Sequence, residues 1–319
     1  MSQSAIPATA FSVETFLEDV RRGAQALRAP CDLARTRQMV ELFDRESREG
    51  VIQFRAASIE KSPLNYRIGC LPDVDWLARA EESGQVPRTP TAERAKRFLR
   101  EARERFPASF YLGADFDVAT GLEKVYLLFV QPVPFEEFLA LPSVPPGLRE
   151  KRGALERHDF HEVVIAAADL VKGSANVYFV WRRPSAAWLD GFAGEWGHGP
   201  IPASTKEEIL RSTPIHGSVA TTWTWDRPVP RRWCVYAIAL RYDRPAAYEP
   251  GGELAGFRLP LRHERFARFD EVVGTQTDRV AYGIGWSFGE PGPYQKYERS
   301  YTRDLLSHYQ AQTDSIEGK

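Results

Sequence analysis

Hydrophobic and polar residues along the chain follow two periods, one helical and one strand-like, in a repeated order. Apolar residues at helical spacing predict helices over 12–28, 32–48, 74–83, 90–105, 186–195 and 205–212, with an interrupted helical region over 135–157 and a helical segment at 261–272. Runs rich in β-branched and aromatic residues predict strands over 51–58, 64–70, 108–117, 124–131, 217–226, 233–240, 280–288 and 294–302.

The segment from Glu162 to Trp181 is predicted to be a β-hairpin, because turn-forming residues interrupt its strand-like arms only at 172–174. In the second arm, alternation places Asn176 and Tyr178 on one face and apolar or aromatic residues on the other. An amide and a phenol on one face indicate a lined cavity with Lys172 at its mouth. A strand with one face in water explains the same pattern equally well.

The order helix, helix, strand, strand recurs roughly five times, at intervals of about 55 to 60 residues. Closure of the resulting sheet into a barrel removes its exposed edges. We therefore predict an α+β fold, a ten-stranded antiparallel β-barrel of five repeated ααββ units with the helices outside. Residues 1–319 are expected to form a single domain that ends in a polar tail at 303–319. A barrel of this width is typical of proteins that hold a ligand inside.

Polar residues share one face of the predicted strands, and this face is the expected inside of the barrel. A basic residue alone is most simply a surface charge, yet several on the same face of successive strands indicate a cationic lining. The residues that share this face are Gln53, Arg55 and Ala57; Asn65 and Arg67; Lys124 and Tyr126; Lys172 and Asn176; Arg232, Cys234 and Tyr236; and Tyr294, Lys296, Glu298 and Ser300.

Composition excludes several classes of protein. Lys and Arg (42) nearly balance Asp and Glu (43), so no overall field favours nucleic acid as a partner. The three cysteines, Cys31, Cys70 and Cys234, are odd in number and far apart, which is typical of a reducing compartment. Because the start is not signal-like and no apolar run has the length of a membrane span, we expect a cytoplasmic protein that binds no membrane.

The chain carries five characteristic segments at residues 123–129, 138–148, 172–179, 217–225 and 294–301. In their order and spacing, these segments resemble the ABBA-type soluble aromatic prenyltransferases, whose fold is the PT-barrel. With the inward arginines, the resemblance implies a diphosphate-binding set of Arg55, Arg67, Lys124, Lys172, Asn176, Tyr178, Arg232 and Lys296. Two positions depart from the family. Asn65 replaces an aspartate that holds magnesium in some members, and Ala220 replaces a tyrosine that helps to hold the diphosphate.

The resemblance implies a transferase of secondary metabolism that moves a dimethylallyl or geranyl group from its diphosphate to a carbon of an electron-rich aromatic acceptor. Fixed cations stabilise the departing diphosphate, and a unit charge pair at about 4 Å is worth on the order of 4 kcal/mol at an effective dielectric of 20. Several Lys and Arg side chains can therefore replace a divalent ion. Arg67 follows Asn65 on the same face, as in metal-independent members, so we expect no cofactor and no magnesium requirement.

Aromatic side chains are expected to shield the carbocation through cation–π attraction. The candidates are Tyr126, Tyr178, Tyr236, Tyr282 and Tyr294, although each is equally explained as ordinary barrel core. Glu298 is the carboxylate of the inward set, so it is the candidate catalytic residue that orients the acceptor or accepts its proton. A salt bridge to Lys296 or Arg232 explains Glu298 equally well.

Family members that accept carboxylated phenols need a cationic anchor on the acceptor side, and the predicted strand VVIAAA at 163–168 carries no charge. The resemblance therefore implies a neutral, fused aromatic acceptor in preference to a small aromatic acid. With Asn65 and the tyrosines, the substrate pocket is predicted to include Val164, Ala166, Ser218, Ala220, Trp286 and Glu298. The predicted partners are the prenyl diphosphate and this acceptor, bound by a monomer.

Other signals of chemistry are weak. His158 and His161 have no further Cys or His nearby, so a metal site is not expected there. Asp115 and Asp117 are too isolated to form the magnesium site of the helical prenyl synthases. The glycines of 283–289 lie within and after a strand, which argues against a nucleotide-binding loop.

Two functions from other classes remain open. A non-catalytic carrier of apolar ligands explains a barrel with an aromatic lining, but it gives the cations no purpose. A phosphohydrolase of the triphosphate-tunnel type explains the cations, but it needs several metal-binding glutamates, and Glu298 stands alone in the predicted lining.

Overall fold

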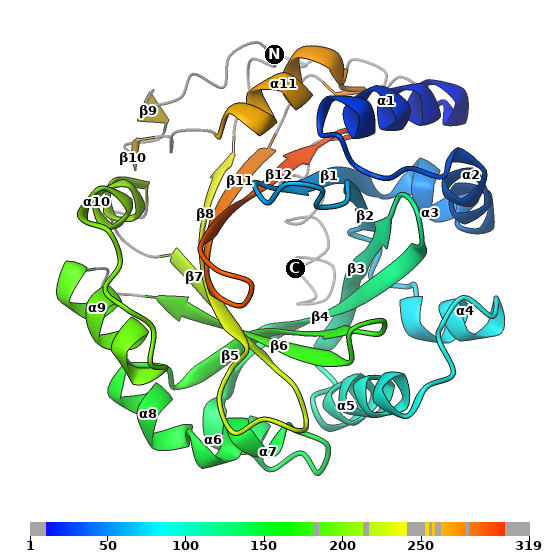
Figure 1. The fold of residues 1–319 in the computed structure, drawn as a ribbon. Helices are drawn as coiled ribbons and strands as arrows, with labels where there is room; N and C mark the ends of the chain where they lie inside the picture. The colour runs from blue at the N-terminus through cyan, green and yellow to red at the C-terminus, as the bar shows by residue number, and fades with distance from the viewer. Residues whose placement is uncertain are drawn as a thin grey trace, which may run out of the picture.

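The structure is a computed structural model that describes residues 11–181, 185–212, 217–240, 253–254, 257–258, 263–277 and 281–303. Within these residues, ten antiparallel strands close into a barrel in the order β1-β12-β11-β8-β7-β6-β5-β4-β3-β2 (Figure 1). The barrel strands are β1 (Val51–Ala57), β2 (Asn65–Gly69), β3 (Ser109–Asp117), β4 (Gly121–Pro134), β5 (Glu162–Asp169), β6 (Ser174–Trp181), β7 (Gly217–Trp223), β8 (Arg232–Leu240), β11 (Ala281–Gly289) and β12 (Tyr294–Ser300). A separate small sheet pairs β9 (Glu253–Leu254) with β10 (Phe257–Arg258).

Helices surround the barrel on its outside (Figure 1). Side-chain oxygens of Ser12, Asp32, Asp75 and Thr89 each accept a hydrogen bond from the backbone N–H three residues later, which fixes the starts of four helices. The helices are α1 (Val13–Ala26), α2 (Leu33–Leu42), α3 (Asp44–Glu49), α4 (Trp76–Glu82), α5 (Pro90–Arg105), α6 (Phe135–Leu139), α7 (Pro146–Glu150), α8 (Arg152–Arg157), α9 (Ala186–Glu195), α10 (Ala203–Ser212) and α11 (Glu264–Val272).

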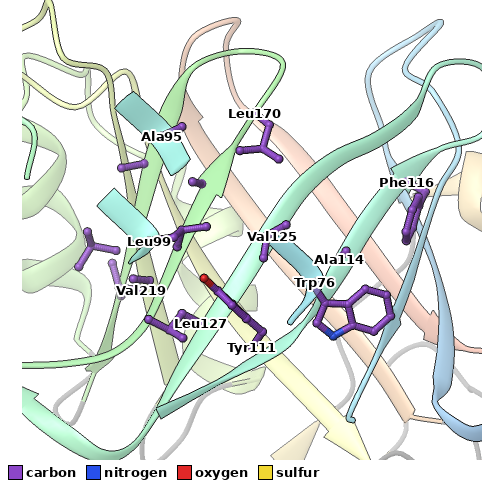
Figure 2. Close-up of a cluster of buried hydrophobic side chains, with 14 of the residues drawn as sticks. Trp76, Ala95, Leu99, Tyr111, Ala114, Phe116, Val125, Leu127, Leu170 and Val219 are labelled. Atoms are coloured by element: carbon purple, nitrogen blue, oxygen red, sulfur yellow. The ribbon is translucent and has the colours of Figure 1, made fainter. Parts of the chain in front are cut away.

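Alternation along the strands separates an outer apolar layer from the barrel interior. The outer layer packs between the strands and the helices, and it includes large buried rings such as Phe54, Tyr66 and Phe116. Figure 2 shows part of this layer, where Trp76 and Leu99 from the helices lie among side chains of the strands. Burial of one such side chain contributes about 1.5–3 kcal/mol, so this layer supplies most of the apolar driving force for folding.

The interior holds a second and smaller apolar cluster that is mixed with polar groups. Its buried members are Tyr126, Ala167, Tyr178, Ala220, Cys234 and Tyr236. Partly buried Leu112, Val164 and Ile165 pack against this cluster. The interior therefore combines tyrosines with small and aliphatic side chains.

Direct hairpins join β1 to β2, β3 to β4, β5 to β6, β7 to β8 and β11 to β12. In an antiparallel barrel of this order, the five hairpin turns lie at the same end, which we call the hairpin end. The longer connections, which contain the helices, join the strands at the opposite end.

The structure confirms the predicted ten-stranded barrel with outer helices and corrects several element boundaries. The helix predicted over 32–48 divides at Phe43 into α2 and α3. The region 135–157 forms three short helices, because prolines separate α6 from α7 and the chain breaks again at Lys151. The sheet of β9 and β10 was not predicted. Apart from Arg303, the predicted polar tail lies outside the described residues.

Candidate active site

A cavity of about 380 Å³ opens at the hairpin end of the barrel. Its walls come from β1, β2, β3, β4, β8 and β12 and from the β5–β6 turn. The charged residues among its lining are Arg55, Glu60, Lys61, Asp115, Glu123, Lys124, Lys172, Arg232, Lys296 and Glu298. An interior with this density of charge cannot be a simple apolar core, so it is the candidate active site.

Arg55 is the centre of a buried ion-pair group on one side of the cavity. It lies opposite Glu298 in the register of β1 and β12, and its Nη2 is 2.7 Å from Glu298 Oε1. Arg55 also contacts Asp115, whose other carboxylate oxygen accepts from Arg67 Nε at 2.8 Å. The Tyr126 hydroxyl donates to Asp115 at 2.6 Å. Two arginines and two carboxylates therefore share one site, and we call Arg55, Arg67, Asp115 and Glu298 the arginine–carboxylate group.

Arg232 and Lys296 lie on β8 and β12, on the neighbouring part of the inner wall, and their hydrogen-bond partners are uncharged or weakly acidic. Arg232 donates to the hydroxyls of Tyr294 at 2.8 Å and Thr222 at 3.2 Å. Lys296 Nζ donates to the Tyr236 hydroxyl at 2.8 Å and to Cys234 Sγ at 3.0 Å. Since no carboxylate of the described residues forms an ion pair with Arg232 or Lys296, this part of the wall suits an anionic ligand.

Lys124 and Lys172 lie at the mouth of the cavity with Glu123, Asp169 and Asn65. Lys172 contacts Glu123, and its Nζ is 3.6 Å from Asp169 Oδ2. Asn65 Nδ2 donates to Glu123 Oε2 at 3.2 Å. Lys124 is 7% exposed and lies opposite both Asp115 and Asp169 in the registers of its neighbouring strands. The two lysines therefore add positive charge where the cavity meets the hairpin turns.

Three tyrosines form a continuous aromatic lining across β4, β6 and β8. The ring of Tyr178 is 6.4 Å from that of Tyr126 and 6.1 Å from that of Tyr236. Burial raises the pKa of Tyr126 and of Tyr178, so both phenols remain protonated. A row of neutral π faces beside fixed cations provides a chemically inert surface for a carbocation.

The environment shifts the pKa of three charged residues by large amounts. Burial lowers the pKa of Lys124 to about 7, an effect that Asp169 opposes and the charge of Arg232 increases. Burial likewise lowers the pKa of Lys296 to about 8. Burial alone would raise the pKa of Glu298, but Arg55 and Arg67 outweigh it and lower that pKa to about 2. Glu298 is therefore ionised, whereas both lysines titrate near neutral pH.

A family model described as aromatic prenyltransferase Orf2 matches residues 11–313. The chain belongs to this aromatic prenyltransferase family. It is 29% identical over 298 residues to 4-hydroxyphenylpyruvate 3-dimethylallyltransferase of Streptomyces niveus, covering 92% of this chain and 86% of the relative. It is 26% identical over 277 residues to 5,10-dihydrophenazine-1-carboxylate 9-dimethylallyltransferase of Streptomyces anulatus, covering 84% and 87%.

The fold is shared with solved structures at much lower identity. The crystal structure of 5-dimethylallyltryptophan synthase from Streptomyces coelicolor superposes with a TM-score of 0.57 at 12% identity, covering 93% of this chain and 99% of that one. The predicted family, fold and enzyme class are therefore confirmed. The enzyme is an aromatic prenyltransferase, and neither a ligand carrier nor a triphosphate-tunnel phosphohydrolase agrees with this family. Among the described residues, none of the helices has the length and apolar character needed to cross a bilayer.

Most residues predicted for the site of the enzyme lie inside its barrel. The cavity wall or the inner apolar cluster contains Arg55, Asn65, Lys124, Tyr126, Val164, Lys172, Tyr178, Ala220, Arg232, Tyr236, Tyr294, Lys296 and Glu298. Arg67 joins them through Asp115, while Asn176 and Ser218 share the inner face with Thr222 and Tyr236, their partners in neighbouring strands.

Three predicted pocket residues lie on the wrong face of their strands. Tyr282 and Trp286 belong to the outer layer, and the indole of Trp286 donates to Glu208 of α10 at 3.4 Å. The inner face of β11 instead carries Gly283 and Gly285, which lie opposite Glu298 and Lys296. Ala166 also faces outward, because an irregularity in the pairing of β5 between 163 and 165 reverses the alternation.

Three carboxylates of the site were missed from the sequence. Asp115 was dismissed as isolated, yet it is 1% exposed and holds both arginines of the arginine–carboxylate group. Glu123 and Asp169 were not considered, although both contact Lys172. The alternative interpretation of Glu298 as a salt-bridge residue named the wrong partners, since within the described residues its ion pairs go to Arg55 and Arg67 and not to Lys296 or Arg232.

Proposed function

We propose that the enzyme transfers a dimethylallyl group, or a geranyl group, from its diphosphate to a carbon of an electron-rich, neutral, fused aromatic acceptor. The observation that carries the proposal is a separation of charge inside the barrel. Arg232 and Lys296 contact uncharged or weakly acidic partners beside the tyrosine lining, whereas Arg55 and Arg67 are neutralised by Asp115 and Glu298. The first region suits a diphosphate and the second suits a neutral acceptor.

Lys124, Arg232 and Lys296 hold the diphosphate and promote its departure. As the allylic C–O bond breaks, its electron pair leaves on the diphosphate, and the negative charge there increases. Fixed cations stabilise this developing charge more than they stabilise the bound substrate, and removal of one comparable electrostatic group costs about 10²- to 10³-fold in rate in other enzymes. Tyr126, Tyr178 and Tyr236 then stabilise the allylic cation without attacking it.

Glu298 holds the acceptor. Its carboxylate has a pKa of about 2, so it accepts a hydrogen bond from a hydroxyl or NH of the acceptor at any ordinary pH. Attack by the ring forms a C–C bond and a strongly acidic arenium ion, which a weakly basic carboxylate is still able to deprotonate. Glu298 therefore orients the nucleophile and receives the proton that restores aromaticity.

We further propose that the reaction needs no magnesium, since the side chains do not fit the ion. Asn65 lacks the second carboxylate oxygen that magnesium prefers, and its amide already donates to Glu123. The oxygens of Asp115 are bound by Arg55, Arg67 and Tyr126. Across the described residues, no group of three or more His, Cys, Asp and Glu side chains is arranged to hold a metal. Full transfer in the presence of EDTA supports this proposal, and activity that returns only when magnesium is added contradicts it.

The acceptor is proposed to be neutral because, within the described residues, the inner faces of β5 to β7 carry no cation. The inner faces of β5 to β7 carry Val164, Tyr178, Ser218 and Ala220, and the nearby arginines are held by Asp115 and Glu298. The relatives from Streptomyces niveus and Streptomyces anulatus are named for acceptors that contain a carboxylate. A competition between 4-hydroxyphenylpyruvate and a dihydroxynaphthalene, with dimethylallyl diphosphate as donor, tests the difference. Faster turnover of the keto acid contradicts a neutral acceptor.

A further inference from the structure

Cys234 lies inside the barrel, between the cations proposed to hold the diphosphate and the tyrosines proposed to shield the carbocation. Its side chain is 1% exposed, and its Sγ accepts a hydrogen bond from Lys296 Nζ at 3.0 Å and donates to Ser287 Oγ at 3.2 Å. It belongs to the inner apolar cluster that also contains Tyr178 and Tyr236. A soft sulfur nucleophile therefore lies directly behind Lys296, one of the side chains that line the cavity.

The electrostatics of this position favour a reactive sulfur. Burial alone would raise the pKa of the Cys234 thiol, but the charges of Lys296 and Arg232 outweigh burial and lower it. Thiols with a lowered pKa beside fixed cations are the reactive cysteines of proteins, whereas cysteines buried in apolar surroundings are inert.

A second observation indicates that this part of the barrel binds a ligand. Asn176 lies on the inner face of β6, opposite Thr222, which in turn lies opposite Arg232. Its side chain is 2% exposed, and its Oδ1 has no hydrogen-bond partner in the described part of the chain. A buried amide oxygen without a partner destabilises the protein, so its place on this wall indicates that a bound ligand completes the site.

We propose that Cys234 captures the allylic cation when no aromatic acceptor occupies the barrel, so that the enzyme prenylates itself at this sulfur. The inference rests on the proposed function, because it requires an allylic diphosphate that ionises in the cavity. The donor C–O bond breaks and its electron pair leaves on the diphosphate. A lone pair of Cys234 Sγ forms the new C–S bond, and the thiol proton passes to the departing diphosphate.

The thioether blocks the cavity beside Lys296 and Arg232, so each captured cation inactivates one enzyme molecule. A bound acceptor protects the enzyme, because its electron-rich carbon takes the cation first. Self-prenylation therefore makes the lifetime of the enzyme depend on the supply of acceptor relative to donor.

The other two cysteines serve as internal controls. Cys31 is exposed at the surface. Partial desolvation of its thiol and the charge of nearby Asp32 raise its pKa. Cys70 is buried, and burial raises its thiol pKa to about 12. Neither has the ammonium contact of Cys234, so labelling that is specific to the site must leave both unmodified.

The test is incubation of the purified full-length enzyme with dimethylallyl diphosphate and no acceptor, followed by intact-mass analysis and peptide mapping. The expected result is a single added isoprene unit on Cys234 and a parallel loss of transfer activity. Excess dihydroxynaphthalene in a second sample should suppress the adduct. The variant Cys234→Ser should resist inactivation, because serine keeps the hydrogen-bonding geometry but its hydroxyl is a much weaker nucleophile.

Two results would overturn the inference, and a third would contradict the proposed function on which it rests. An enzyme that prenylates dihydroxynaphthalene yet shows no adduct on Cys234 would retain its proposed function and lose this inference. Equal labelling of Cys31 and Cys234 would mean that free cation in solution is the reagent. Absence of both transfer and adduct would instead contradict the proposed function itself. Because the mapping uses the wild-type protein, the test does not depend on the folding of any variant.

Discussion

Arg55 and Glu298 lie directly opposite each other on β1 and β12, and their side chains form a buried ion pair with 2.7 Å between Arg55 Nη2 and Glu298 Oε1. Arg55 also contacts Asp115, which places it between two carboxylates. Breaking a buried pair by removing one partner typically costs 3–5 kcal/mol, because the other charge is left uncompensated. In this site Asp115 still compensates Arg55 when Glu298 is removed, which reduces the cost in stability. Glu298 is therefore held in place firmly, yet it remains available to a substrate.

The first prediction concerns Glu298→Gln. The variant keeps the shape of the side chain but removes the charge that orients the acceptor and receives its proton. Transfer to a neutral acceptor should fall by about 10²- to 10⁴-fold, while the affinity for dimethylallyl diphosphate changes only slightly. Single-turnover assays and donor-binding titrations measure the two effects separately. Asp115→Asn is the matched control, because it disturbs the same arginines from β3. Equal losses of transfer and donor affinity in Glu298→Gln would reassign Glu298 to a purely structural role.

The second prediction concerns the cations of the diphosphate region. Lys124→Ala and Arg232→Ala should each lower transfer by roughly 10²- to 10³-fold, because each removes charge that stabilises the departing diphosphate. The fold should persist, since both side chains face the cavity and not the outer apolar layer. Arg227→Ala is the control at the same end of the barrel, because Arg227 is exposed and pairs with Glu290. Wild-type rates in both cavity variants would place the diphosphate elsewhere.

The third prediction is a pH dependence of donor binding. Burial lowers the pKa of Lys124 to about 7 and that of Lys296 to about 8 in the free enzyme. A bound diphosphate favours the charged lysines and raises both pKa values, so the complex binds more protons than the free enzyme does. The affinity of the enzyme for dimethylallyl diphosphate should be highest below pH 7. It should fall as the pH rises through the higher pKa values that Lys124 and Lys296 have in the complex.

Calorimetry checks this prediction when it is repeated in buffers of different ionisation enthalpy. Between pH 7 and 8, binding of dimethylallyl diphosphate should take up protons. Lys124→Arg should reduce the uptake, because the guanidinium remains charged throughout this range. Donor affinity that does not change across this range would contradict the assignment of the two lysines to the diphosphate.

Much of the site could be predicted from the sequence because polar and apolar residues alternate on most strands. On β12, the inward set of Tyr294, Lys296 and Glu298 was evident from alternation alone. The same rule failed on β11, where both faces lack charge and the inner face carries small residues, Gly283, Gly285 and Ser287. There, alternation does not distinguish the inner face, and Trp286 was wrongly predicted to line the pocket.

Asp115 shows a different limit of the sequence. Its importance depends on Arg67 of β2 and Lys124 of β4, which lie opposite it in the registers of β3. Register between strands cannot be deduced from the alternation of one strand, so Asp115 was considered only with Asp117, as a pair too isolated to hold magnesium. The irregular pairing of β5, which turns Ala166 outward, was hidden for the same reason.

The fourth prediction compares the two inner glycines of β11. A Cβ on Gly285 would lie 2.8 Å from two ring atoms of Tyr236, whereas a Cβ on Gly283 would lie 3.5 Å from Glu298 Cβ. Gly285→Ala should therefore displace a buried ring that Lys296 holds by a hydrogen bond, at a cost of about 1–3 kcal/mol. Gly283→Ala should fold normally. Thermal unfolding of the two variants measures the difference, and equal stability would show that Tyr236 is not packed against Gly285.

The last prediction distinguishes the two faces of the barrel by comparing Trp286→Phe with Tyr236→Phe. Trp286 lies in the outer layer against α10, so loss of its indole should lower stability by roughly 0.5–3 kcal/mol and leave the order of preference among acceptors unchanged. Tyr236 lies inside, where its hydroxyl accepts from Lys296. Tyr236→Phe removes only this hydroxyl and keeps the ring. The stability of the fold should therefore change little, while the rate of transfer should fall. Thermal unfolding and a panel of phenolic and fused acceptors measure both properties in each variant. A change of acceptor preference in Trp286→Phe would return the indole to the cavity and contradict the placement of β11.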